Sequence, residues 1–385
     1  MRQTTRFRMG RAPSTAALVA ALVVVLGACT AANPPSTPTP TPTRDPNALN
    51  VTALLDLSGS RAPSGAPQRD ALQLWADQHA SGTPRVKLKI TDVAGSPSKT
   101  ALELRREAVE ARADAIIVGI SVDYDEAFAN LVQLAQVPVL FTLPIPDPAM
   151  RGGGWVFALA PTPAQLARVV LDDAAQRSVL ASGLFVSDES TSAVIERIAL
   201  VKELARRQVT PTVVTVMPTD ATQKLRLLLA TTSLAFFAGT PRTYLEAART
   251  ATVGTTLYFS YVSELGDIGD LRDAAPLAVW PGSRWIATSA TGTSNLARTT
   301  FVQTYTDRAG PPTSVAASAY DALTLLSSAA DKSIDPVSVR DQLQSGTFTG
   351  VATTYTFSPS QHAGFNTSDL ALLRYIGVRV LPAVR

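Results

Sequence analysis

Short runs of apolar residues alternate with stretches of helical periodicity along most of this chain. In its first half the apolar runs lie at 51–57, 86–91, 115–119 and 137–142. Between them apolar positions recur every three or four residues, which predicts helices at 66–80, 99–111 and 125–135. Strands that alternate with helices at this spacing indicate βαβ units and a parallel sheet.

The alternation restarts after residue 161 and changes near the end of the chain. Strands are predicted at 182–187, 212–216, 234–238 and 256–260, and helices at 164–176 and 191–207. Helices at 295–308, 314–330 and 336–344 precede three short strand-like runs, at 350–357, 370–376 and 378–381. We therefore expect an α/β fold with two units of similar build, each with its own parallel sheet, and small antiparallel additions at the end of the chain.

The first 28 residues have the pattern of an export signal. Four arginines precede an apolar run of 12 residues at 16–27. A run of this length is too short to span a bilayer, which takes about 20 residues. It suits the apolar region of a signal peptide, so we expect residues 1–28 to be removed.

Cys29 follows this segment and is the only cysteine in the chain. The order Leu26, Gly27, Ala28, Cys29 resembles the lipobox of bacterial lipoproteins. That resemblance implies that the Cys29 thiol receives a diacylglycerol and holds the protein at the extracytoplasmic face of the cell membrane. The alternative is an ordinary signal peptide with a cysteine near the cut, since a single cysteine has no internal disulfide partner.

Residues 29–50 are rich in proline and threonine, which predicts an extended tether without a packed core. Loss of the signal also changes the charge of the chain. The whole chain has 34 basic and 31 acidic residues, and four of the basic ones are the arginines of the signal. The rest of the chain carries 30 basic and 31 acidic residues, so its charge does not favour nucleic acid as a partner.

Short motifs then follow in an order that resembles the type 1 periplasmic binding proteins, most closely the branched-chain amino acid binding group. The first is Leu55-Asp56-Leu57-Ser58-Gly59, followed by Gly65, and the second is Asp92 together with residues 96–101. The others are the segments 116–121, 136–140 and 155–162, then Ala319-Tyr320-Asp321-Ala322 and Phe348-Thr349-Gly350. The resemblance covers about 51–381.

This resemblance implies two lobes, each with a doubly wound parallel sheet, joined by three crossovers at a hinge. Lobe 1 is expected at 51–156 and 288–345, and lobe 2 at 157–287 and 346–385. Ligands of such sheets bind at the carboxyl ends of the strands, so we expect one cleft between the lobes. The family also implies a monomer that delivers its ligand to an ABC permease.

In lobe 1 the candidate ligand-binding residues are Ser121, Thr142, Leu143, Arg61 and Ser64. Ser121 follows a buried strand, where its hydroxyl and helix-start N–H groups favour an anion, or it caps the next helix. Thr142 matches a substrate-binding position of the family, or its hydroxyl bonds to nearby backbone. Leu143 lies beside it. Arg61 and Ser64 belong to the first βα loop, where Arg61 pairs with an anionic ligand or is solvated.

In lobe 2 the candidates are Asp188, Tyr258 and Tyr261. Asp188 follows a strand and contacts the ligand or caps a helix. The two tyrosines bracket a strand end and stack on an apolar ligand or belong to the core. Amino-acid binders of this family carry a carboxylate for the ammonium group in the loop that corresponds to 238–243. That loop has no acid here and includes Arg242, so we expect a neutral or acidic ligand.

The residues give no support for catalysis, a metal or a cofactor. The chain has two histidines, His79 and His362, far apart in the sequence, and it has no nucleophile elbow or phosphate-binding loop. The expected function is a lipid-anchored extracytoplasmic solute-binding protein that captures a small polar molecule for an ABC importer. The alternative is a sensing or interaction module of the same fold without a transporter, and a hydrolase is disfavoured.

The anchor prediction can be tested at Cys29 itself. Cys29→Ser should abolish palmitate labelling and release the protein from the membrane fraction, because stable anchoring takes two or more acyl chains. Ser36→Ala, in the tether, is the control and should label normally. Labelling of Cys29→Ser at the wild-type level would show that Cys29 is not the lipidated residue.

Overall fold

The computed structural model describes residues 45–59, 65–146, 154–178, 180–239, 241–264, 278–287, 295–377 and 379–383. These residues belong to a unit that spans Thr43–Arg385. Cys29, Arg61 and Ser64 lie outside the described residues, so the expectations for them stay predictions. Among the described residues, no helix combines the length and the apolar composition needed to pass through a membrane.

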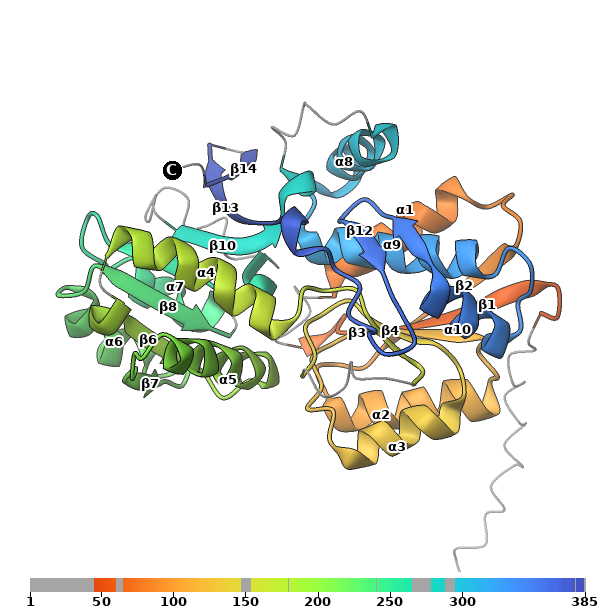
Figure 1. Ribbon diagram of the computed structural model, residues 1–385, viewed down its shortest axis with the longest axis horizontal. Helices are drawn as coiled ribbons and strands as arrows, with labels where there is room; N and C mark the ends of the chain where they lie inside the picture. Colours follow the sequence, from red (N-terminus) through yellow and green to blue (C-terminus); the bar gives the residue numbers. More distant parts are fainter. Residues whose placement is uncertain are drawn as a thin grey trace, which may run out of the picture. The chain divides into compact units, whose positions relative to one another are not determined.

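The first sheet has five parallel strands in the order β2-β1-β3-β4-β5. They are β1 (Ala48–Leu55), β2 (Arg85–Asp92), β3 (Ala115–Gly119), β4 (Val139–Phe141) and β5 (Val156–Ala158). Helices α1 (Ala66–Gln78) and α9 (Ser314–Ala329) cover one face, and α2 (Pro97–Arg105) and α3 (Glu126–Ala135) cover the other (Figure 1). Burial on both faces explains why β3 and β4 are continuous apolar runs.

Alternate residues of the inner strands pack into different cores. Val51, Leu55 and Ile117 join the core that includes α1 and α9. Leu54 and Ile116 join the core that includes α2 and α3. Because side chains alternate between the faces of a strand, a slip of one residue would exchange the two sets, so these cores fix the register.

The second sheet has seven strands in the order β14-β13-β10-β9-β8-β6-β7. They are β6 (Leu184–Ser187), β7 (Val213–Thr215), β8 (Leu234–Ala238), β9 (Thr256–Phe259), β10 (Ala278–Ser283), β13 (Leu370–Ile376) and β14 (Arg379–Pro382). The strands from β6 to β10 are parallel, and β13 and β14 add to them in antiparallel pairs.

Helices also cover both faces of this second sheet. Phe236 and Tyr258 face α4 (Pro163–Arg177) and α5 (Thr191–Arg206). Phe237 and Phe259 lie in the core with α6 (Ala221–Leu229) and α7 (Pro241–Ala248). Two parallel sheets, each buried between helices, confirm the expected α/β fold.

Three elements of the second sheet region were not predicted, namely α6, α7 and β10. The missed strand β10 contains Pro281 and Gly282, which normally argue against a strand. Pro281 nevertheless pairs with Leu372 of β13 in antiparallel register. Tertiary pairing has overridden the local signals here. The helix expected at 99–111 also differs, because α2 continues as a π-helical turn at Arg106–Glu110.

The chain passes between the two sheets three times: after β5, between β10 and α8 (Leu296–Ala309), and before β13. Helix α10 (Pro336–Ser345) packs on α9, and an antiparallel pair follows, β11 (Thr347–Thr349) and β12 (Thr354–Thr356). The sequence assigned 346–385 to lobe 2. The ring of Phe357 packs on Phe157 of β5 with centroids 5.3 Å apart, so the first part of this segment lies with lobe 1 and only β13 and β14 extend the lobe 2 sheet.

Asp321 of α9 holds the last crossover segment. Its carboxylate accepts hydrogen bonds from the backbone N–H of Val351 at 2.7 Å and of Ala352 at 2.8 Å, and from the Tyr355 hydroxyl at 3.0 Å. The side chain is fully buried, which raises the pKa of Asp321 to about 7. This carboxylate of α9 therefore caps a loop from another part of the chain.

Asp321→Ala should lower the free energy of unfolding by about 3 kcal/mol or more, because it leaves two buried N–H groups and a hydroxyl without an acceptor. Urea denaturation measures this change. Asp341→Ala is the matched control, since Asp341 is an exposed acid that pairs with Arg340, and it should change stability by less than about 1 kcal/mol. Equal effects of the two variants would contradict the role given to Asp321.

Candidate functional site

Ser121, Thr142 and Leu143 lie together at the carboxyl edge of the first sheet. Ser121 follows β3, and Thr142 and Leu143 follow β4, the neighbouring strand. Asp125 rather than Ser121 caps α3, because its Oδ1 accepts from the Phe128 backbone N–H at 2.8 Å. The helix-cap alternative for Ser121 is therefore wrong. Among the described residues none forms a hydrogen bond with its hydroxyl, which remains available to a ligand.

Thr142 is fully buried, and its hydroxyl has a partner that the sequence did not indicate. It donates to Gln68 Oε1 of α1 at 2.5 Å, and Gln68 Nε2 donates to the Gly119 carbonyl at 2.8 Å. A Cβ on Gly119 would lie 2.3 Å from Gln68 Oε1, so this approach requires a glycine at the end of β3. Gln68 thus ties α1 to the ends of β3 and β4 and fixes the orientation of the Thr142 hydroxyl.

Asp188 occupies the corresponding edge of the second sheet. It follows β6, is 5% exposed, and accepts from the Ser190 backbone N–H at 2.9 Å and from the Thr243 hydroxyl at 3.2 Å. A Cβ on Gly239, whose φ is 125°, would lie 2.5 Å from the Asp188 carboxylate. Asp188 therefore brings an acidic group against the 238–243 loop, which has no acid of its own.

Tyr258 and Tyr261 are both buried in lobe 2. The ring of Tyr258 stacks on Phe236 with centroids 5.0 Å apart, and its hydroxyl donates to Asp173 Oδ2 of α4 at 2.7 Å. This placement matches the core alternative for Tyr258. The side chain of Arg242 lies outside the described residues.

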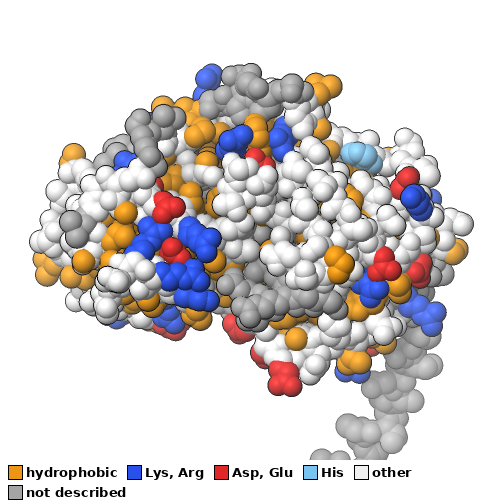
Figure 2. All heavy atoms as spheres, viewed as in Figure 1, with side chains coloured by type: hydrophobic (Ala, Val, Ile, Leu, Met, Phe, Trp, Pro, Cys, Tyr) orange, Lys and Arg blue, Asp and Glu red, His pale blue; other side chains and the backbone are white. Residues whose placement is uncertain are grey.

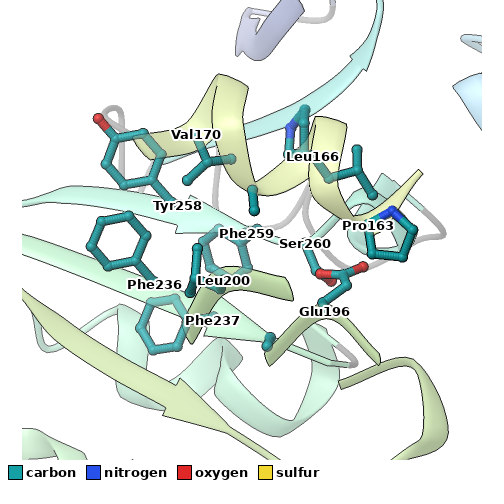
Figure 3. Close-up of a pocket in the computed structure, with 13 residues that line it drawn as sticks. Pro163, Leu166, Val170, Glu196, Leu200, Phe236, Phe237, Tyr258, Phe259 and Ser260 are labelled. Atoms are coloured by element: carbon teal, nitrogen blue, oxygen red, sulfur yellow. The ribbon is translucent and has the colours of Figure 1, made fainter. Parts of the chain in front are cut away.

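A pocket of about 40 Å³ opens between α4, α5 and the second sheet (Figure 3). Its wall is almost entirely apolar, from Leu166 and Val170 of α4 to Phe236 of β8. Glu196 of α5 is the exception, and its carboxyl group lies at one end of the pocket beside Ser260, which directly follows β9 (Figure 3).

Sequence reasoning missed Glu196, although the sequence carries a signal for it. Along α5 the buried residues Ala193 and Leu204 and the pocket residue Leu200 lie on one stripe, and Glu196 occupies the intervening position of that stripe. A carboxyl group on the apolar stripe of a helix is unusual, because burial of a charge is costly unless it is paired.

Burial raises the pKa of Glu196 to about 8, and the negative charge of Asp188 adds to this effect. Hydrogen bonds from Ser260 and from the Tyr261 backbone oppose the shift because they favour the ionised form. The Oε1 atom is buried and has no hydrogen-bond partner among the described residues. The lobe 2 edge therefore contains a carboxyl group that is mostly protonated at neutral pH and has one oxygen unused.

Basic side chains gather on the face that α4 and α5 form, with acidic side chains among them (Figure 2). Arg206 and Arg207 both pair with Glu203, at 3.0 and 3.2 Å, and Arg207 also pairs with Asp172 at 2.7 Å. These are partly exposed pairs that largely satisfy each other. This face therefore does not form the unbroken basic surface that nucleic acid requires.

The two histidines have structural partners in separate places. His79 stacks on Trp75 with ring centroids 4.2 Å apart, and His362 Nδ1 lies 2.6 Å from the Val156 carbonyl oxygen. In the described part of the chain, no group of three His, Cys, Asp or Glu side chains could hold a metal ion.

Comparisons with known proteins agree with this geometry. The family described as periplasmic binding protein matches residues 48–376. No curated protein matches the chain. Among solved structures, a type 1 periplasmic binding protein from Bordetella pertussis is 16% identical, with a TM-score of 0.71 over 87% of this chain and 100% of that one.

Two further structures are similar in fold and differ in what their titles name as ligand. A leucine-binding protein from Thermotoga maritima is 15% identical, with a TM-score of 0.70 over 87% of this chain and 98% of that one. A solute-binding protein of an ABC transporter from R. palustris, in complex with benzoate, is 16% identical, with a TM-score of 0.68 over 87% and 95%. These neighbours are binding proteins rather than enzymes.

The pKa of Glu196 predicts a pH dependence of stability. The folded value of about 8 lies above the usual 4.5, so the folded chain binds this proton more tightly than the unfolded chain. The contribution of Glu196 to stability is therefore fully present below pH 4.5 and is lost as the pH rises towards 8. As the pH rises from 5 to 8, the free energy of unfolding of the wild type should fall by about 2 kcal/mol or more relative to that of Glu196→Gln.

Denaturant titrations at several pH values measure this difference. Glu189→Gln is the control, because Glu189 lies just before the N-terminus of α5 and its side chain is 55% exposed. This substitution should leave the pH dependence unchanged. Parallel curves for wild type and Glu196→Gln would show that Glu196 keeps its ordinary pKa.

Proposed function

The chain belongs to the periplasmic binding protein family, and from that premise we propose that it captures a small polar molecule between its two lobes. The family match spans both sheets, which also bears out the resemblance drawn from the sequence motifs. In this proposal the chain is a lipid-anchored monomer on the outer face of the cell membrane, held through Cys29.

The observation that carries the proposal is the polar group at each sheet edge. Ser121 and Thr142 lie at the carboxyl ends of β3 and β4, and Asp188 lies at the carboxyl end of β6. In doubly wound sheets this edge is where ligands bind. A ligand held by both edges would draw the lobes together, and a hinge at the three crossovers would allow that closure.

Delivery to an ABC importer completes the proposed function. The R. palustris neighbour is titled as part of an ABC transporter, which supports this role for a chain of the same fold. A sensing module of the same fold would use the same cleft without a transporter. A permease and two ATPases encoded beside this chain would favour the importer over the sensor.

The fold does not select the ligand. One neighbour is titled as a leucine-binding protein and another holds benzoate, although both share this architecture. The ligand is therefore set by the side chains at the sheet edges, where function generally lies in such folds.

A calorimetric panel of amino acids and the matching carboxylates, amides and polyols tests the proposal on the full chain. Replacing both Ser121 and Thr142 with Ala should weaken the tightest interaction at least tenfold, because a lost hydrogen bond to a charged group costs about 1.5–3 kcal/mol. Thr299→Ala with Thr300→Ala, two exposed positions on α8, is the matched control. Unchanged affinity in the Ser121 and Thr142 variant, or no binding in the panel, would contradict the proposal.

A further inference from the structure

We propose that the Glu196 pocket is the part of the ligand site that selects a cationic nitrogen on a short apolar group. This inference rests on the proposed function, since it assigns a ligand class to the lobe 2 edge. It replaces the expectation of a neutral or acidic ligand, which was based on the 238–243 loop alone. The structure brings the carboxyl groups of Asp188 and Glu196 to that same edge.

One oxygen of the Glu196 carboxyl group has no hydrogen-bond partner in the described part of the chain. Glu196 Oε1 is buried and has no hydrogen-bond partner among the described residues, and its side chain lines the pocket. A buried polar atom without a partner costs free energy comparable to a lost hydrogen bond. A donor supplied by a ligand would satisfy it, and Figure 3 shows the carboxyl group at the end of the pocket next to Pro163 and Ser260.

The charges around the Glu196 carboxyl group favour a cation. The pocket wall contributes one other titratable group, Tyr258 of β9, whose hydroxyl is bound to Asp173. Asp188 does not line the pocket, but its negative charge raises the pKa of Glu196. Burial raises the pKa of Tyr244 of α7, and the charges of both acids add to that effect. No ion pair joins Glu196 to a lysine or arginine in the described ranges. An anionic ligand would be repelled here, and a cation would supply the missing positive charge.

Hydrogen bonds within the protein already favour the ionised form of Glu196. Ser260 and the Tyr261 backbone hydrogen-bond to the Glu196 carboxyl group and favour its charged state. A cation at Oε1 would therefore add a charged donor to a carboxylate that already has hydrogen bonds from Ser260 and the Tyr261 backbone. Because Glu196 is mostly protonated at neutral pH without a ligand, cation binding would release about one proton per chain to the solvent.

The size of the pocket limits the ligand group. Its volume of about 40 Å³ equals about three water-sized spheres, since one sphere needs about 10–15 Å³. The apolar end, lined by Val170, Phe236 and Tyr258, suits an alkyl chain of two or three carbons, with the nitrogen beside Glu196 (Figure 3). Affinity should rise about fourfold per added methylene until the pocket is full.

Calorimetry on the full chain at pH 7 tests this with propylammonium, propan-1-ol and propionate as probes. Propylammonium should bind at least tenfold more tightly than propan-1-ol, and propionate should bind least. Comparison of phosphate and HEPES buffers should reveal the release of close to one proton. Affinity for propylammonium should increase as the pH rises from 6 to 8, because the ionised form of Glu196 becomes more populated.

Glu196→Gln should lose both the preference for the amine and the proton release, while it keeps its affinity for propan-1-ol. Glu189→Gln should behave as the wild type. Equal affinities for amine and alcohol in the wild type, an amine preference that survives in Glu196→Gln, or no binding of any probe would overturn the inference.

The outcome separates this inference from the proposed function. If the affinity for a compound of the calorimetric panel depends on Ser121 and Thr142 while the amine test fails, the proposed binding function is supported and the cation pocket is refuted. If the amine test succeeds and the Ser121 and Thr142 variant binds normally, the cation pocket is supported and the assignment of Ser121 and Thr142 to the ligand site is wrong.

Discussion

Burial of two parallel sheets on both faces is the constraint on which this structure depends. Helices on each face shield the inner strands from solvent, so the side chains within β3, β4 and β8 are apolar. Polar groups then concentrate where the strands end, and in a parallel sheet these ends share one edge. The location of the candidate site is thus a consequence of how the sheets are covered.

Buried polar side chains hold that edge in place. Gln68 joins α1 to the ends of β3 and β4, Asp188 joins the turns after β6 and β8, and Asp321 holds the last crossover segment. Each of these groups is satisfied by partners from distant parts of the chain. Glu196 differs from them because one of its oxygens is left without a partner. Other buried polar atoms of the described residues also lack a partner, among them Trp285 Nε1 and His362 Nε2, but of these atoms only Glu196 Oε1 belongs to a residue that lines the pocket.

The sequence predicted the fold class well and the site only in part. Strands such as β3 and helices such as α9 carry strong periodic signals, so their existence and limits could be predicted to within a few residues. Strand β10 could not, because Pro281 and Gly282 oppose a strand locally and only pairing with β13 overrides them. The sequence placed Ser121 correctly after a strand, but it did not show that Asp125 rather than Ser121 caps α3.

The partners of buried polar groups were the hardest part to predict. Thr142 and Gln68 are separated by 74 positions, and the link between Glu196 and the loop after β9 likewise depends on packing that no local pattern encodes. The sequence therefore located the acid-free loop at 238–243 but could not show that two acids from other segments lie beside it.

The most direct test of this account is a crystal structure of the full chain with the compound that binds most tightly in calorimetry. We expect a ligand that contacts the lobe 1 edge at Ser121 and the lobe 2 edge at Asp188, with a donor nitrogen at hydrogen-bond distance from Glu196 Oε1. A ligand bound away from both sheet edges would contradict it.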